Sequence, residues 1–117
     1  MVQRSLRDSS GTRLSEEAIR EIVRRIVEAC RPARVILFGS AAAGRMTSDS
    51  DIDLLVLEDS VADARGESLR LRKVLADLPS PFDVLVMETG RFEETRDVIG
   101  GLAWPAARHG RVIYEAA

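Results

Sequence analysis

Apolar residues recur every three or four positions between residues 19 and 30, with charged residues between them. This spacing places the apolar side chains on one stripe and predicts an amphipathic helix. Ser15 stands before the stripe as a helix N-cap, and two acidic residues follow it in the first turn, where they stabilise the helix dipole. Pro32 predicts the end of the helix, because the residue before a proline disfavours the helical conformation.

Short apolar runs alternate with further helical patterns along the rest of the chain. Strands are predicted at 35–38, 51–57, 82–87 and 111–114. Helices are predicted at 61–78, 91–99 and 102–109, with a short one at 41–45. Wholly apolar runs are typical of strands that are covered on both faces. The order of elements predicts an α/β or α+β domain, with a small mixed β-sheet flanked by helices.

The length and the distribution of polar residues indicate a single domain. The chain has 117 residues, of which 45% are hydrophobic, so it can form one core of ordinary size. Its first residues are polar and interrupted by Ser, Gly and Asp. We therefore expect residues 1–14 to be a flexible N-terminal arm and residues 15–117 to be the domain.

Charge and cysteine content narrow the classes of function. Seventeen basic residues stand against 19 acidic ones, a net charge of −2, which argues against a general nucleic-acid or membrane surface. Cys30 is the single cysteine, so no internal disulfide can form, as is usual in a reducing cytoplasm. No signal-like or membrane-spanning apolar segment is present in the sequence. We therefore expect a cytoplasmic protein.

Gly39-Ser40 follows the first predicted strand and precedes a short helix. The start of a helix presents free backbone N–H groups that bind phosphate oxygens readily. Gly39 would let the backbone approach a phosphate closely, and the Ser40 hydroxyl would add a donor. On the dipeptide alone, a tight turn capped by serine is the favoured explanation.

Three carboxylates accompany the next two strands. Asp51 and Asp53 project from the same side of their strand, because residues two apart point the same way. A divalent cation would relieve their repulsion, and hard oxygen ligands suit Mg²⁺ or Mn²⁺. Asp83 lies within another apolar strand, and if the two strands are neighbours it can join a cluster typical of two-metal sites. Solvent-exposed positions at the strand starts would explain all three residues without a metal.

These residues together resemble a known family. Gly39-Ser40, a ten-residue spacer over 41–50, and Asp51-Ile52-Asp53 form the signature of the DNA-polymerase-β-like nucleotidyltransferase superfamily. The short length, the third acid Asp83 and the C-terminal segment 109–114 are similar to the minimal nucleotidyltransferase branch. Many members of that branch are antitoxins paired with a HEPN-type ribonuclease toxin.

The resemblance implies a reaction and a set of roles. Asp51 and Asp53 would bind two Mg²⁺ ions, with Mn²⁺ as an alternative, and Asp83 would bind the catalytic ion and help to activate the attacking hydroxyl. Gly39 and Ser40 would hold the triphosphate of ATP. The hydroxyl would attack the α-phosphorus and release pyrophosphate. In the antitoxin branch the hydroxyl belongs to a tyrosine of the toxin, which becomes adenylylated and inactive.

The chain departs from the family at one position of the phosphate loop. Many relatives carry an arginine immediately before the second glycine, whereas here Ala43 precedes Gly44. A nearby positive charge for the triphosphate must then come from Arg45 or be missing.

Two further readings of the sequence stay open. The chain has no separate helical domain to hold an acceptor, which suggests that the acceptor arrives on a partner protein. The chain could instead neutralise its partner by non-covalent occlusion, with nucleotide binding but little catalysis. It could also act on a small molecule, using a cleft between two copies of itself. The sequence therefore allows either a homodimer or a hetero-oligomer.

Overall fold

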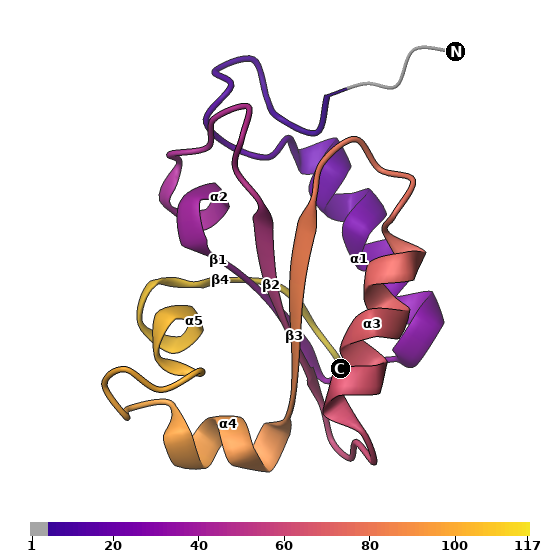
Figure 1. Ribbon diagram of the computed structural model, residues 1–117, viewed down its shortest axis with the longest axis vertical. Coiled ribbons are helices and arrows are strands. Elements are labelled where there is room, and N and C mark those ends of the chain that lie inside the picture. The colour runs from indigo at the N-terminus through magenta and orange to yellow at the C-terminus, as the bar shows by residue number, and fades with distance from the viewer. Residues whose placement is uncertain (1–4) are drawn as a thin grey trace.

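The computed structural model describes residues 5–117 (Figure 1). Its helices and strands follow one another as α1 (Glu16–Cys30), β1 (Arg34–Phe38), α2 (Gly39–Ala43), β2 (Ile52–Glu58), α3 (Ala64–Val74), β3 (Phe82–Glu88), α4 (Thr89–Thr95), α5 (Trp104–His109) and β4 (Arg111–Glu115). The predicted class, a small mixed sheet flanked by helices, is confirmed. The helices predicted over 61–78, 91–99 and 102–109 are shorter than expected. The Asp63 carboxylate caps the start of α3, hydrogen-bonded turns follow α3 and α4, and another turn precedes α5, which starts later than predicted and ends at His109 as predicted.

The four strands form one sheet in the order β3-β2-β1-β4. β1 is antiparallel to both of its neighbours, β2 and β4. β2 and β3 are parallel, and α3 is the crossover that parallel neighbours require. This crossover brings the starts of β2 and β3 to the same end of the sheet, with β3 as an edge strand.

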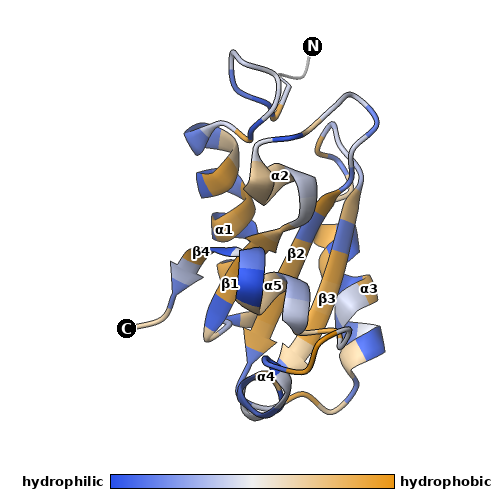
Figure 2. Ribbon diagram, turned by 90° about the vertical axis from the view of Figure 1, so that its left-hand side faces the viewer, coloured by the Kyte–Doolittle hydropathy of each residue, from blue (hydrophilic) through white to orange (hydrophobic). Residues whose placement is uncertain are grey.

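Helices cover both faces of the sheet. One core joins α1 and α3 to the sheet through residues such as Ile22 and Leu71. The other joins α4 and α5 to the opposite face through Phe92 and Ala106. Along β2, alternate residues serve alternate cores, as the predicted two-sided burial requires. Figure 2 accordingly shows β1, β2 and β3 as hydrophobic over much of their length.

The first helix begins and ends as its sequence predicts. The Ser15 hydroxyl accepts a hydrogen bond from the Ala18 N–H at 3.0 Å, which satisfies one of the donors left free at a helix start. Arg31 adopts a left-handed conformation and its N–H donates to the Val27 carbonyl, which closes the helix before Pro32.

Residues 5–14, which the sequence assigned to a flexible N-terminal arm, pack against the domain. Leu6 and Leu14 are buried in the core beside α1. The Met46 N–H donates to the Thr12 carbonyl at 2.9 Å and joins the segment to the loop that follows α2. Two separated leucines create no periodic pattern, so the sequence did not reveal this packing. Residues 1–4 of the predicted arm lie outside the described residues.

No helix within residues 5–117 combines the length and the apolar character that crossing a membrane would require.

Candidate functional site

Two of the three predicted carboxylates start neighbouring strands at matching positions. Asp53 in β2 and Asp83 in β3 are direct partners in the parallel register. Adjacent strands lie about 4.8 Å apart. Alternation along each strand places both side chains on the sheet face that α4 and α5 cover further along. Figure 2 shows the corresponding hydrophilic band near the start of each strand.

Asp51 lies immediately before β2 and is exposed to solvent. Burial, followed by the negative charges of Asp83 and Asp51, raises the pKa of Asp53 above its ordinary value. An ionised Asp53 therefore destabilises the folded chain, and a nearby cation would remove that destabilisation.

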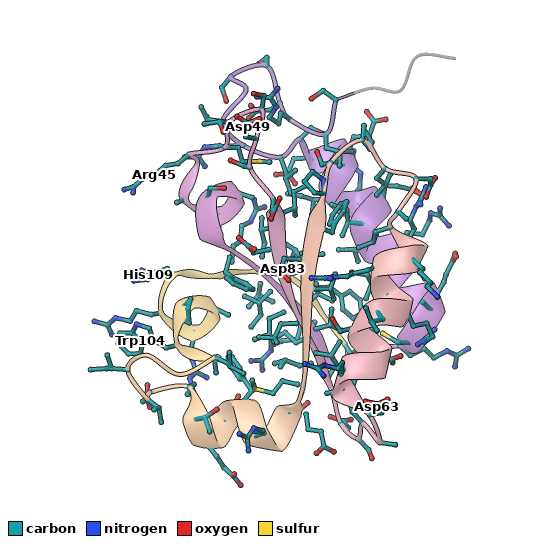
Figure 3. The ribbon with its side chains drawn as sticks, viewed as in Figure 1. Arg45, Asp49, Asp63, Asp83, Trp104 and His109 are labelled. Carbon is teal, nitrogen blue, oxygen red and sulfur yellow. The ribbon has the colours of Figure 1, made fainter. Side chains whose placement is uncertain are left out.

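Arg72 of α3 forms an ion pair with Asp83, with 2.8 Å between Nη2 and Oδ1. In residues 5–117, Asp51, Asp53 and Asp83 do not place three oxygen atoms within 4.8 Å of one another. Figure 3 shows Asp83 at the front of the sheet, where α3 can reach it. The strands bring these carboxylates to one end of the sheet, but Arg72 holds one of them.

The donor set fits a hard divalent cation. All three side chains offer carboxylate oxygens, which suit Mg²⁺ and Mn²⁺. The like charges that raise the pKa of Asp53 are those that such an ion neutralises. Arg72 contacts only Oδ1 of Asp83, and both side chains are exposed, so Asp83 can still offer an oxygen to an ion.

Gly39 is required by its contact with Asp53. The residue has a φ of +71°, and a Cβ atom at this position would overlap the Asp53 carboxylate. α2 begins at Gly39, and no side chain caps its first turn. Ser40 and the free N–H groups of that turn therefore lie near the carboxylates. The sequence predicted the dipeptide, while the structure shows why its first residue is glycine.

The cations near this loop come from two places. Arg45 follows Gly44, the C-cap of α2, is exposed, and points away from the sheet in Figure 3. Arg13 of the N-terminal segment reaches the same loop: its Nε is 3.1 Å from the position that a Cβ on Gly44 would take. The sequence analysis missed Arg13 because it assigned that residue to a flexible arm.

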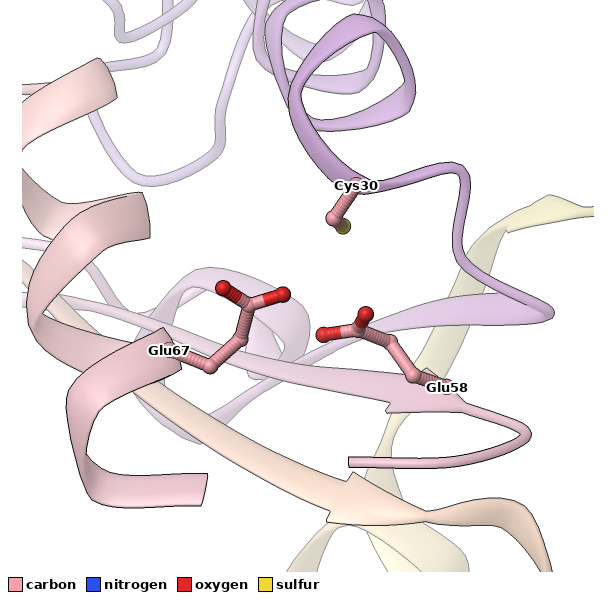
Figure 4. Close-up of side chains that lie close together, drawn as sticks. All are labelled: Cys30, Glu58 and Glu67. Atoms are coloured by element: carbon pink, nitrogen blue, oxygen red, sulfur yellow. The ribbon is translucent and has the colours of Figure 1, made fainter. Parts of the chain in front are cut away.

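A second cluster lies at the opposite end of β2 (Figure 4). Cys30, Glu58 and Glu67 place one sulfur and two oxygen atoms within 4.8 Å of one another. Burial and the hydrogen bond to Glu67 raise the pKa of Glu58 to about 7, so the two carboxyl groups share a proton near neutral pH. Burial also raises the pKa of the Cys30 thiol to about 12, which leaves it unreactive. Arg70 pairs with Glu67 at 2.7 Å and balances its charge.

The comparisons with known proteins agree with this architecture. Residues 16–100 match the family model of the nucleotidyltransferase domain, and the chain belongs to that family. The resemblance predicted from the sequence is confirmed. No curated protein matches the chain.

Three solved chains that are similar to this one come from toxin–antitoxin complexes. A chain of a mutant MntA–HpeT complex is 20% identical, with a TM-score of 0.57 over 88% of this chain and 75% of that one. A chain of a toxin–antitoxin structure with AMP-PNP is 21% identical, with a TM-score of 0.53 over 82% of this chain and 73% of that one. A third, from a complex of the tri-AMPylated HEPN toxin of Shewanella oneidensis with its MNT antitoxin, has 19% identity and a TM-score of 0.46 over 84% and 73% of the two chains. At these identities the likeness concerns the fold alone.

Proposed function

We propose that this chain is an antitoxin that transfers AMP from ATP to a tyrosine hydroxyl of a HEPN-type ribonuclease toxin. The observation that carries the proposal is the pairing of Asp53 and Asp83 in parallel register beside Gly39. The membership of residues 16–100 in the nucleotidyltransferase domain family supports the class of reaction.

Asp51, Asp53 and Asp83 are the residues that would hold two Mg²⁺ ions, with Mn²⁺ as the alternative. Such ions neutralise the charge that develops on the phosphoryl oxygens and lower the pKa of the attacking hydroxyl. Asp53, half-buried between the other two, is the central ligand of the proposed set. Asp83 is exposed, and in the proposed reaction it would take up the proton of the incoming hydroxyl.

The triphosphate would lie against the start of α2. The Ser40 hydroxyl and the uncapped N–H groups of α2 can donate to phosphate oxygens, and the close approach of Asp53 to Gly39 would place a metal ion beside them. Arg45 and Arg13 are the nearby cations, and Arg13 offers the charge that Ala43 cannot supply. In the transfer the acceptor oxygen bonds to the α-phosphorus, the bond to the bridging oxygen breaks, and pyrophosphate leaves.

The test is a transfer assay with ATP labelled at the α-phosphate, Mg²⁺ and the purified HEPN-type toxin. We expect label on the toxin with the natural chain and none with Asp53→Asn. Asp49→Asn is the matched control, because Asp49 is an exposed acid of the spacer loop and should leave transfer intact. An unlabelled toxin, or equal label with Asp53→Asn, would contradict the proposal.

Non-covalent occlusion is the second candidate, and one surface feature favours it. Val98, Ile99 and Leu102, between α4 and α5, are 54%, 81% and 68% exposed. Apolar side chains gathered on one short segment are typical of a protein interface. If the double variant Asp51→Ala/Asp53→Ala still protects cells from the toxin, occlusion is sufficient and transfer is secondary.

A further inference from the structure

A groove with a volume of about 620 Å³ runs along the outer side of β3. α3 forms one wall, and α4 with the segment before α5 forms the other, as the positions of these helices around β3 in Figure 1 show. Asp83 lines the groove at one end of the strand and Glu88 at the other. The groove therefore extends from the proposed active site along the whole strand.

The floor of the groove is a strand edge whose outward backbone groups are not paired with another strand. β3 is the last strand of the sheet on this side. The N–H of Ile52 donates to the Pro81 carbonyl, so in a parallel ladder the even-numbered residues of β3 direct their backbone groups away from β2. The Val84 carbonyl confirms this direction, because it accepts a hydrogen bond from the Ser68 hydroxyl of α3. Val86, two residues further, presents its N–H and C=O to the groove.

The walls supply apolar contacts and positive charge. Leu69 of α3 and Leu102 are 53% and 68% exposed, and both line the groove. Arg65 and Arg91 also line it, one from α3 and one from α4, and neither forms an ion pair with any residue of the described part of the chain. An open strand edge recognises another polypeptide backbone, and unpaired guanidinium groups favour carboxylates beside it.

We propose that the acceptor protein binds here through an extended, acidic segment that pairs with β3 as an added strand. This inference rests on the proposed function, since it takes the acceptor to be a protein. The six positions from Asp83 to Glu88 span about 20 Å at roughly 3.3 Å per residue, so a segment of about six residues fits the edge. Its acidic side chains would contact Arg65 and Arg91, and the acceptor hydroxyl would arrive at the Asp83 end.

The first test uses Leu69→Asp/Leu102→Asp, two changes at exposed positions that place negative charge in the groove. We expect the KM for the HEPN-type toxin to rise about tenfold or more, as for central interface residues. The affinity for ATP with Mg²⁺, measured without the toxin, should not change. Val112→Asp is the control, because Val112 is 49% exposed and does not line the groove. An unchanged KM, or a weakened ATP affinity that marks the groove as part of the nucleotide site, would overturn the inference.

The second test is hydrogen exchange of the natural chain with and without the toxin. Slower exchange of the Val84 and Val86 amides in the complex is expected. Unchanged exchange at these amides would contradict strand addition. Slower exchange when the chain alone is concentrated would also contradict it, because a second copy of the chain would then cover the edge. If the toxin protects β3 but receives no AMP, the proposed reaction fails while the binding site stands. If AMP is transferred and β3 is not protected, only the binding site fails.

Discussion

The Asp53 carboxylate occupies the space that a Cβ atom on Gly39 would need. The contact joins the start of α2 to the start of β2, two elements that are separated in the sequence by the spacer loop. It places the proposed phosphate-binding turn directly beside the central carboxylate of the proposed metal site. A substitution at Gly39 should therefore change both the stability of the protein and its proposed activity.

Gly39→Ala should destabilise the protein and abolish nucleotide transfer. The left-handed backbone costs a residue with a Cβ about 1–2 kcal/mol, and the overlap must displace Asp53 as well. Gly90→Ala is a matched control within α4, where a Cβ would meet no atom within 4 Å. It should be neutral or stabilise by up to about 1 kcal/mol, since alanine favours a helix over glycine. Chemical denaturation of both variants measures the difference, and equal stabilities would refute the role of the contact.

Asp53→Asn should make the metal-free protein more resistant to heat while it removes activity. Burial and the charges of Asp83 and Asp51 raise the pKa of Asp53, so an ionised side chain opposes folding near neutral pH. The amide has no charge and escapes this repulsion. Thermal unfolding without metal should show a higher Tm for the variant. Added Mg²⁺ with ATP should raise the Tm of the natural chain and not that of the variant.

Arg13→Ala should weaken ATP binding about tenfold, the loss typical of one charge-assisted hydrogen bond of roughly 1.4 kcal/mol. The reason is the position of its guanidinium beside Gly44, next to the loop that lacks an arginine at Ala43. Arg20→Ala serves as the control, because Arg20 is an exposed residue of α1. Titration of a fluorescent ATP analogue with Mg²⁺ compares the two. Equal affinities would show that Arg13 only packs against the loop.

The stability of the natural chain should fall as the pH rises from about 4.5 to about 7. The folded chain raises the pKa of Glu58 from 4.5 to about 7, so between these values it holds a proton that the unfolded chain has released. The stability that this proton contributes is fully present below pH 4.5 and is lost as the pH rises through about 7. The pKa of Glu67 is lowered, so the stability that this group contributes is lost only at pH values below 4.5, outside this range.

Glu58→Gln should remove this part of the pH dependence and be the more stable protein at pH 8. Glu94→Gln, at an exposed position of α4, should keep the natural profile. Urea denaturation at a series of pH values measures all three proteins. A natural chain whose stability does not change between pH 4.5 and 7 would contradict the shared proton.

The sequence alone determined which segments form helices and strands, though not where each helix starts and ends, because the choice of element follows from local periodicity. The stripe over 19–30 predicted α1, and the apolar run after Asp53 predicted a strand that is buried on both faces. The Gly39-Ser40 and Asp51-x-Asp53 motifs and their spacing also indicated the nucleotidyltransferase family, which the match over 16–100 confirms.

Only the tertiary structure decided which distant residues meet. The crossover through α3 sets β3 beside β2, and this pairing alone brings Asp83 level with Asp53 and leaves β3 with an open edge. The packing of Leu6 and Leu14 into the core holds Arg13 near Gly44. Such contacts depend on strand order and on the burial of isolated side chains, and neither leaves a periodic signal in the sequence.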